Sequence, residues 1–509
     1  MKNKKTGWIV PAALIALGIL GIALGAGKAL EIHRVRSTKL VVWDAPSSMR
    51  TGTEEDMSTN TELVRPMDLV LSPLVTLSVN EKKVPVYETN VSHSHVDSAS
   101  TPLQSRTPVA IFDFDGVVRV ELKPGFVPES AEVLPSAAGI LPEIREDTVS
   151  FTLDGPGNYT VVFNGAEERA MHLFTRLPEK DVPDPEDESV LYFAPGEYDA
   201  GTVDLKSGQT LYLAGGAVLH GNIRADHTEN VKIRGRGIVD GSRYGGDASN
   251  RVVRIPVDLE ESKNVTVEGI TLLNSNGWVI QGYSSESVTV DGVAIVSSRA
   301  NGDGITLQSC RDFLVKNSFV RTWDDSLVVK NYAGNTDNLT FEDNQIWTDL
   351  AQSMEIGYET NKGYRENAVI ENITFRRNTV LYNLHKPVIS IHNGDSCDVR
   401  HIVYEDTVVE HADMAFSNHL VEIQILESGW STTYERGTVE DVTVSGLRVL
   451  ASSHDKLAAS ISGFGRTYFV KDVIFSGLDV LGNTGGEALD FKIDSKNTEH
   501  IAVRKEASK

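Results

Sequence analysis

Cysteine is nearly absent from this chain, which has only Cys310 and Cys397 among its 509 residues. Two cysteines are too few for a disulfide framework or for a zinc site built on thiolates. The fold must therefore be stabilised by packing, and the sequence does not decide whether the two thiols pair with each other.

Basic residues are also scarce. The chain has 48 Lys and Arg against 71 Asp and Glu, a formal net charge of −23. A general nucleic-acid binder needs a stripe of Lys and Arg to neutralise phosphates, so this class is excluded. The charge argues less strongly against an acidic substrate, because a local basic groove can exist within an acidic protein.

Helical periodicity is missing from the C-terminal half, where a repeated β-type unit takes its place. Each unit alternates apolar and polar residues, is rich in Val, Ile and Thr, and turns on Gly, Asn or Asp. The first four copies follow one another at 23, 26 and 25 residues. Such a period predicts a solenoid whose units bury their apolar faces on their neighbours. The copies begin at Asn264, Ser287, Phe313, Asn338, Asn372, Asp441 and Asp472.

A second short strand recurs within each unit, at residues 304–308, 325–330, 353–357 and 388–392. Two or three short strands per coil predict a parallel β-helix. A β-propeller is the main alternative, but its blades need about forty residues and four strands each. The observed spacing is too short for such blades.

The chain is too long for one ordinary core, so we expect two domains or a solenoid with an appendage. Residues 63–188 contain short alternating runs separated by turn signals, followed by a Pro- and acid-rich connector. They predict a small antiparallel β-sandwich. Residues 31–62 are polar and predict a linker, and residues 189–509 form the expected β-helix. The predicted fold class is therefore all-β.

The N-terminus carries a targeting signal. Three lysines precede an uncharged run at residues 8–27, which is long enough to span a bilayer with the basic flank on the cytoplasmic side. A signal peptide is the alternative, because residues 23–25 have the small-residue pattern of a cleavage site. We predict that residues 1–30 are a transmembrane anchor or a signal peptide and favour the anchor. Either one places the rest of the chain outside the cell.

One motif in the N-terminal region points to a different chemistry. Residues 111–117, Ile-Phe-Asp-Phe-Asp-Gly-Val, resemble the nucleophile loop of haloacid-dehalogenase-type phosphatases. Those enzymes place this loop in a parallel α/β sheet with helices after it. No helical pattern follows here, so we predict a hairpin without catalytic function.

Three carboxylates form the candidate catalytic cluster. Asn301-Gly302-Asp303-Gly304 is followed, 21 residues after Asp303, by the pair Asp324-Asp325. That spacing is about one coil of the solenoid, so the three side chains are expected side by side. Glycosidic hydrolysis needs one protonated carboxyl for the leaving oxygen and one ionised carboxyl to activate water. Close like charges push their pKa values apart, which supplies both forms at one pH.

Together with residues 190–198, 205–221, 322–331 and 354–358, this cluster resembles the pectin-lyase-like β-helix glycosidases. The resemblance covers roughly residues 189–494. It is closest to the clan of glycoside hydrolase family 28, the polygalacturonases, and family 49, dextranase and isopullulanase. It implies a right-handed parallel β-helix and hydrolysis with inversion. It also implies that Asp324 is the general acid, and that Asp303 and Asp325 orient and deprotonate the water.

The chain departs from the polygalacturonase pattern at two places. Residues 351–353 read Ala-Gln-Ser where a Gly-His-Gly segment is expected, and Ser390-Ile391-His392 replaces an Arg-Ile-Lys triplet that grips the galacturonate carboxylate. Loss of the Arg and Lys removes the charge-assisted contacts that an acidic sugar needs. We therefore expect a neutral α-glucan as substrate, with a pectin hydrolase as the alternative.

Register along the strands that carry the aspartates suggests further cleft residues. A neutral-sugar site needs an aromatic platform, for which Trp278 and Trp323 are candidates. We expect a monomer that acts on a polysaccharide or oligosaccharide without a cofactor or metal, since the carboxylates lack a metal-specifying spacing. A polysaccharide lyase and a non-catalytic carbohydrate-binding solenoid stay open as alternatives, because fold alone does not determine function. The candidate substrate-binding residues are Asn301, Trp278, Lys330, Gln352, Glu355 and His392.

Overall fold

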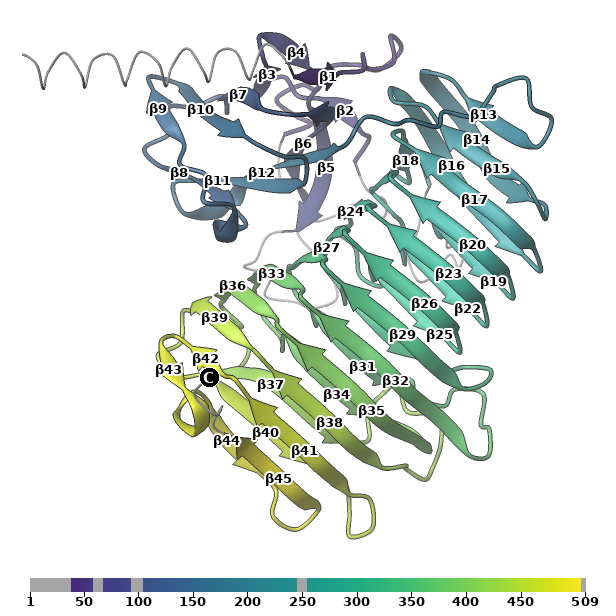
Figure 1. Cartoon of the computed structure of the whole chain (residues 1–509), viewed down its shortest axis with the longest axis vertical. Helices are drawn as coiled ribbons and strands as arrows, with labels where there is room; N and C mark the ends of the chain where they lie inside the picture. The colour runs from purple at the N-terminus through teal and green to yellow at the C-terminus, as the bar shows by residue number, and fades with distance from the viewer. Residues whose placement is uncertain (1–37, 58–66, 93–103, 245–253, 505–509) are drawn as a thin grey trace, which may run out of the picture.

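The computed structural model describes residues 38–57, 67–92, 104–244 and 254–504. Its regular structure is β throughout, apart from two short 3-10 turns at Ser136–Ala138 and Gly485–Glu487. A domain of mainly antiparallel sheets lies beside a long stack of parallel strands (Figure 1). The predicted all-β class and parallel β-helix are confirmed. The predicted anchor lies outside the described residues, within which no helix is long and apolar enough to cross a membrane.

The N-terminal domain is a sandwich of two sheets whose facing sides share one apolar core. In the larger sheet every pair is antiparallel except β6 with β12, which is parallel. The larger sheet contains β1 (Lys39–Val41), β2 (Val70–Leu71), β5 (Tyr87–Ser92), β6 (Gln104–Asp115), β8 (Ala131–Leu134), β11 (Asn158–Phe163) and β12 (Ala166–Arg176). The smaller sheet contains β3 (Thr76–Val79), β4 (Lys82–Val84), β7 (Val118–Lys123), β9 (Glu143–Arg145) and β10 (Thr148–Leu153).

Two predictions for this region were wrong. Residues 39–41, assigned to a linker, form β1 and pair with β6, Leu40 opposite Phe114. The sequence around residues 39–41 is polar and gave no strand signal, because β1 takes its hydrogen bonds from β6, which is distant in sequence. Residues 111–117 do not form a hairpin, because β6 and β7 belong to different sheets and the chain crosses the sandwich between them.

The β-helix has three strands in each coil. Within each stack, register advances by one coil, as from Val265 to Val288 to Phe313, so neighbouring copies of the repeat pair in parallel. One stack is β13 (Val190–Phe193), β15 (Thr210–Leu213), β17 (Glu229–Gly235), β20 (Lys263–Glu268), β23 (Glu286–Asp291), β26 (Arg311–Lys316), β29 (Thr336–Glu342), β32 (Ala368–Arg376), β35 (Cys397–Glu405), β38 (Val439–Ser445), β41 (Val470–Ser476) and β45 (Thr498–Arg504).

The other two stacks begin from the long strands β14 (Gly196–Leu205) and β16 (Ala217–Asp226), since β16 pairs with both β18 and β19. The second stack continues with β18 (Ile238–Asp240), β21 (Thr271–Leu273), β24 (Ala294–Val296), β27 (Phe319–Thr322), β30 (Gln345–Thr348), β33 (Thr379–Asn383), β36 (Val408–Ala412), β39 (Arg448–Ala451) and β42 (Asp479–Val480). The short β43 (Asn483–Thr484) pairs with β42 in antiparallel orientation. The third is β19 (Val257–Glu260), β22 (Ile280–Tyr283), β25 (Ile305–Gln308), β28 (Leu327–Lys330), β31 (Met354–Tyr358), β34 (Ile389–Asn393), β37 (His419–Ile425), β40 (Ala458–Ser462) and β44 (Asp490–Ile493).

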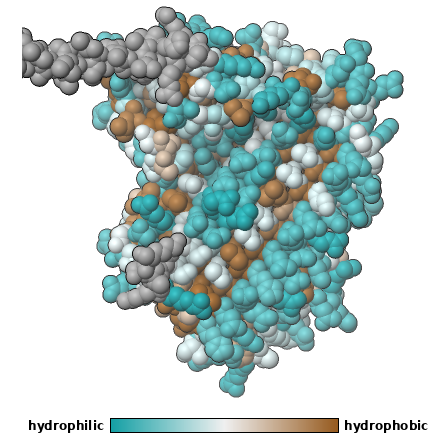
Figure 2. Space-filling view, viewed as in Figure 1, coloured by the Kyte–Doolittle hydropathy of each residue, from teal (hydrophilic) through white to brown (hydrophobic). Residues whose placement is uncertain are grey.

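Stacked aliphatic side chains fill the interior of the helix in one continuous cluster that runs from Leu205 to Leu489. This is the core that the alternating pattern predicts, since every second residue of each strand points inward. Cys310 and Cys397 belong to this core and are both free. The face shown in Figure 2 is mostly hydrophilic, with narrow apolar bands across it.

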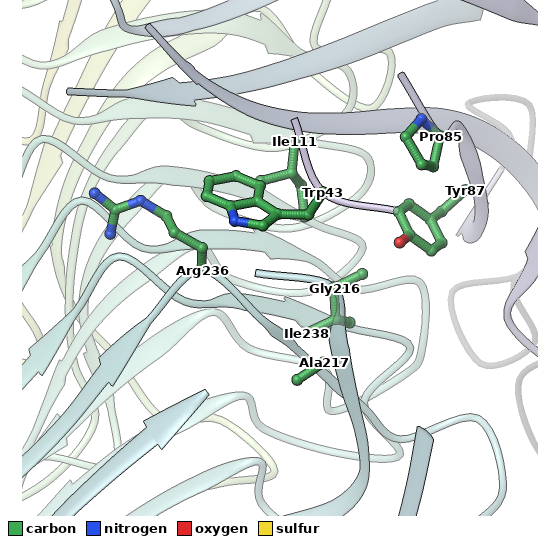
Figure 3. A pocket seen from close by; sticks show the side chains of 8 residues that line it. All are labelled: Trp43, Pro85, Tyr87, Ile111, Gly216, Ala217, Arg236 and Ile238. Atoms are coloured by element: carbon green, nitrogen blue, oxygen red, sulfur yellow. The ribbon is translucent and has the colours of Figure 1, made fainter. Parts of the chain in front are cut away.

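A second apolar cluster joins the two domains. Side chains of the larger sandwich sheet, such as Phe174, pack against residues of the second stack, such as Phe319 and Trp347. Trp43, which follows β1, lies between Ile111 and Tyr87 of the sandwich and Gly216, Ala217 and Ile238 of the helix (Figure 3). Only about 10 Å³ of cavity is left there. The larger sheet is thus covered on both faces, by the smaller sheet on one side and by the β-helix on the other.

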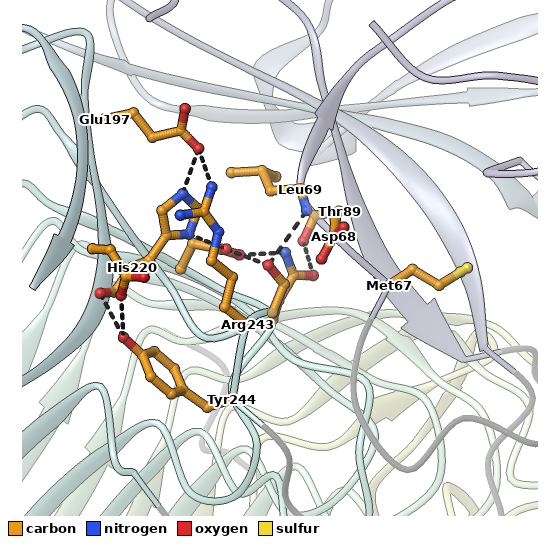
Figure 4. A network of polar contacts seen from close by, with 12 residues as sticks. Met67, Asp68, Leu69, Thr89, Glu197, His220, Arg243 and Tyr244 are labelled. Carbon is orange, nitrogen blue, oxygen red and sulfur yellow. Dashed lines mark hydrogen bonds and ion pairs between the residues drawn. The ribbon is translucent and has the colours of Figure 1, made fainter. Parts of the chain in front are cut away.

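A chain of polar contacts follows the same seam (Figure 4). Asn274 of the helix accepts hydrogen bonds from Asn90 N at 2.8 Å and Thr89 Oγ1 at 2.9 Å, and donates to Asp240 at 2.6 Å. Asp240 in turn contacts His220 Nδ1 at 2.8 Å. These buried hydrogen bonds give the seam a specific register as well as apolar area.

Candidate active site

The third stack places Asp303 and Asp325 on neighbouring coils. Each lies two residues before its strand, β25 or β28, and Ile305 pairs with Leu327. The two aspartates therefore occupy equivalent positions, one coil apart. The backbone keeps them there, since Gly304 N donates to Asp325 O at 2.8 Å.

The identities of the turn residues around the aspartates have a steric explanation. Asn301 has a left-handed φ of 55°, which Asn tolerates better than most residues. A Cβ at Gly304 would lie 2.5 Å from Ser326 O, so a side chain there would separate the coils. Asn301 N donates to Asp324 Oδ2 at 2.8 Å, and Asp325 N donates to Asp324 Oδ1 at 3.1 Å. The Asn-Gly-Asp-Gly sequence thus orients the third aspartate as well.

All three aspartates open into one cleft of about 240 Å³. Three of the predicted substrate-binding residues lie in it with them, and five further residues complete its wall. The cleft is lined by Trp278, Asn301, Asp303, Asp324, Asp325, Lys330, Tyr358, Glu359, Lys386, Ser428 and Trp430.

The cleft shifts the titration of two of its carboxyl groups. Burial raises the pKa of Asp303 to about 7; Lys330 opposes this rise, and Asp324 and Glu359 add to it. Burial also holds the pKa of Asp325 well above its usual range, with further contributions from the charges of Asp324 and Asp303. With a pKa of about 7, Asp303 can exchange protons near neutral pH, as acid–base catalysis requires.

Lys330 is a buried cation with compensated charge. Its Nζ lies 3.1 Å from Glu359 and 3.6 Å from Asp303, and 4.9 Å from the centre of the Trp278 ring. Burial disfavours the ammonium, but Asp303 and Glu359 together raise the pKa of Lys330 above its usual range. Lys330 is therefore charged, and its charge stabilises the ionised form of Asp303.

Gln352, Glu355 and His392 lie beneath the cleft wall. Gln352 N donates to Asp325 Oδ1 at 2.9 Å, and its side chain donates to the Tyr358 hydroxyl at 3.1 Å. His392 stacks on Tyr358 with ring centres 4.5 Å apart. These three side chains are almost fully buried. The sequence register thus predicted the right region, but the side chains lie behind the cleft wall and do not line the cleft.

His392 is held between two carboxylates. Its Nδ1 contacts Glu355 and its Nε2 contacts Glu422, each at 3.0 Å, and Ser390 donates to Glu355. Burial disfavours the imidazolium, but Glu355 and Glu422 together raise the pKa of His392 to about 9. At neutral pH the positive charge of His392 is thus already paired.

Several cleft residues were missed by the sequence argument, and one candidate is excluded. Glu359 directly follows β31, whose sequence Met-Glu-Ile-Gly-Tyr was recognised, so the register argument could have found it. Lys386 lies in the turn between β33 and β34, which corresponds to the turns that carry Asp325 and Gln352, so the same register argument could have found it. Ser428 and Trp430 lie in an inserted loop without a repeat pattern, so no signal marked them. Trp323 is 2% exposed, so its ring is not available to a sugar. Within the described ranges no three His, Cys, Asp or Glu side chains are grouped to hold a metal ion.

Comparison with known proteins identifies the family of this chain. Residues 201–496 match the family described as "Glycosyl hydrolases family 28". The chain is 25% identical over 175 residues to an "Endo-polygalacturonase" of Pectobacterium carotovorum subsp. carotovorum, covering 30% of this chain and 42% of that protein. It is 26% identical over 105 residues to a "Probable polygalacturonase" of Vitis vinifera, covering 20% of this chain and 21% of that protein. The match thus spans less than half the length of either relative.

The fold is similar to that of Dex49A from Penicillium minioluteum, with a TM-score of 0.60 and 13% identity over 90% of this chain and 97% of that one. At this identity the likeness concerns the fold, including the N-terminal sandwich. The family match is the stronger statement, because it covers more than half of the chain. The chain belongs to glycosyl hydrolases family 28.

Proposed function

We propose that this protein hydrolyses O-glycosidic bonds of a neutral polysaccharide with inversion at the anomeric carbon. Asp324 donates a proton to the leaving glycosidic oxygen. An ionised carboxylate of the Asp303 and Asp325 pair takes a proton from water, whose oxygen attacks the anomeric carbon from the opposite face. The pKa of Asp303, raised to about 7, supports this exchange of protons near neutral pH.

The pairing of the cleft cations carries the proposal of a neutral substrate. Ser390 and His392 stand where a polygalacturonase has Arg and Lys, and both contact Glu355. Lys330 is paired with Asp303 and Glu359. A buried uronate carboxylate must find an uncompensated cation, and none of these positions offers one.

A pectic polymer is the second candidate because of Lys386. This residue lines the cleft, and no carboxylate of the described residues lies within ion-pairing distance of its Nζ. A uronate that reached Lys386 would gain a direct ion pair. The sequence relatives named as polygalacturonases point the same way.

A substrate panel separates the two candidates. Dextran, pullulan and polygalacturonate are compared by release of reducing ends, and proton NMR of the first turnovers identifies the product anomer. We expect faster release from a neutral glucan, inverted product, and little change in KM for Lys386→Met. Faster release from polygalacturonate, with a KM that rises in Lys386→Met, would instead establish the pectic substrate, and a retained anomer would exclude the mechanism.

The pH dependence of kcat/KM should follow the charges around Asp303. Lys330 lowers the pKa of Asp303 and Glu359 raises it. Lys330→Met therefore moves the acidic limb of the profile to higher pH, because the base ionises later, and Glu359→Gln moves it to lower pH. Each shift is expected to be roughly 1 pH unit. Lys362→Met is the matched control, since Lys362 pairs with Glu359 at 3.8 Å but is 47% exposed, and should leave the limb in place.

We further propose residues 189–509 as the catalytic domain and the sandwich as its structural support. This is supported by the apolar seam, which leaves the larger sandwich sheet covered on both faces. We also propose that the protein acts outside the cell, because a polysaccharide substrate is found there. A fusion reporter placed at the C-terminus checks it by its accessibility to added protease in intact cells.

A further inference from the structure

Asp395 connects two loops to the turn that follows β34. Its side chain is fully buried. Asp395 Oδ1 accepts hydrogen bonds from Thr432 N at 2.6 Å and Thr433 N at 2.8 Å. Asp395 Oδ2 accepts from Thr360 N at 3.1 Å and Asn361 N at 3.2 Å. Each carboxylate oxygen thus binds the backbone of a different loop.

Both loops carry residues of the cleft wall. The Glu359 loop, residues 359–367, joins β31 to β32, and its first residue is the partner of Lys330. The Trp430 loop, residues 426–438, joins β37 to β38 and contributes Ser428 and the 59% exposed Trp430. The bonds to Asp395 begin one residue after Glu359 and two residues after Trp430.

The charge of Asp395 is balanced by these amides. No Lys, Arg or His of the described segments lies within ion-pairing distance of it, so backbone N–H groups and the hydroxyls of Thr432 and Thr433 are its partners. These donors leave neither oxygen of the buried side chain without a hydrogen bond. The preceding Gly394 lets the loops approach, because a Cβ there would lie 2.5 Å from Tyr358 O.

We propose that Asp395 is a positioning residue that shapes the substrate cleft by holding the Glu359 loop on one carboxylate oxygen and the Trp430 loop on the other. It touches no substrate. It keeps Glu359 against Lys330 and Trp430 on the cleft wall, so the two loops move together or not at all. This proposal rests on the proposed function only for its effect on catalysis, and the contacts themselves are independent of the substrate.

An isosteric substitution separates the two oxygens. Asp395→Asn keeps one acceptor and replaces the other with an NH₂ group, which faces backbone N–H donors and cannot bind them. Asn is therefore expected to hold one loop and release the other, and Asp395→Ala to release both. Asp398→Asn is the matched control. Asp398 likewise accepts from a backbone amide, Thr438 N at 3.0 Å at the far end of the Trp430 loop, but it does not bind Thr360, Asn361, Thr432 or Thr433, and Asn keeps the accepting Oδ1.

Hydrogen exchange measured on the full chain shows directly whether Asp395 holds the two loops. In the wild type, the amides of Thr360, Asn361, Thr432 and Thr433 should exchange more slowly than other amides of the same loops. One pair should lose its protection in Asp395→Asn and both pairs in Asp395→Ala, with no change in Asp398→Asn. Unprotected amides in the wild type, or protected loops in Asp395→Ala, would overturn the proposal. The wild-type measurement decides even if the variants do not fold.

Kinetics on the best polymer of the substrate panel test the effect on the cleft. In Asp395→Asn we expect kcat/KM to fall by a factor on the order of 10², as for an ångström-scale misplacement of a binding group. In Asp395→Ala, which frees the Glu359 loop, the acidic limb should also move to lower pH, as in Glu359→Gln. A merely structural role would lower the amount of active protein without moving the limb. Released loops with unchanged kinetics contradict the positioning role, whereas slow turnover of every sugar by the wild type contradicts only the proposed function.

Discussion

Replacing Asp324 with Asn is expected to lower the hydrolysis rate by a factor on the order of 10²–10⁴, the range for loss of a general acid. Asn is isosteric, and its single carbonyl oxygen can still accept one of the two hydrogen bonds that Asn301 N and Asp325 N donate to the separate oxygens of Asp324. It has no proton to give to the leaving oxygen, so binding should be kept and kcat should fall. The measurement is the rate of reducing-end release at saturating substrate.

The control for this experiment is Asp312→Asn. Asp312 is an exposed residue of β26 with a left-handed φ of 56°, and its Oδ1 accepts a hydrogen bond from Asn338. Asn tolerates that conformation and keeps the acceptor, so this variant should be fully active. Wild-type activity in a folded Asp324→Asn protein would remove Asp324 from the mechanism. A substrate with an activated leaving group should recover part of the rate, because such a group departs without protonation.

Arg236→Met should lower the free energy of unfolding by about 3–5 kcal/mol, the usual cost of leaving one partner of a buried ion pair alone. Arg236 Nε lies 2.8 Å from Asp113 Oδ2, and the two side chains are 8% and 1% exposed. The pair joins β6 of the sandwich to the first coils of the helix. Urea unfolding followed by circular dichroism measures the change.

The destabilisation by Arg236→Met should depend on pH. Burial raises the pKa of Asp113 to about 6 even though Arg236 lowers it, and loss of Arg236 raises it further. The penalty of ionising Asp113 in the folded state is absent below its ordinary unfolded pKa and grows as pH rises toward the folded value. The loss is therefore expected to be larger at pH 8 than at pH 5. The double variant Asp113→Leu with Arg236→Met should recover much of the stability, and equal losses in the single and double variants would refute the ion-pair explanation.

The β-helix was predictable because each of its strands pairs with strands of the adjacent coils, which are close in sequence. A parallel β-helix repeats its hydrogen bonds once per coil, so the same alternation of apolar and polar residues must return at nearly the same interval. The same rule made the catalytic candidates visible, since Asp303 and Asp325 stand at one position of neighbouring coils.

The sandwich was predictable only in part. Alternating runs identified a β domain, but strand pairing depends on partners far along the chain. Leu40 looked like part of a linker because its partner is Phe114, and residues 111–117 looked like a hairpin because no local signal shows that the chain changes sheets. Asp113 in that motif serves the domain seam through Arg236, which no sequence spacing reveals.

By itself, the sequence determined the all-β class, the coil repeat and the side-by-side placement of the aspartates, because each follows from periodic hydrogen bonding and packing between adjacent coils. Only the tertiary structure decided what surrounds them. It brought Ser428 and Trp430 to the cleft from an inserted loop and placed His392 between two glutamates below the surface. Inserted loops obey no period, and their positions are determined by single buried contacts such as those of Asp395. For this reason the candidate catalytic aspartates could be identified from the sequence, whereas the charge and shape of the rest of the cleft could not.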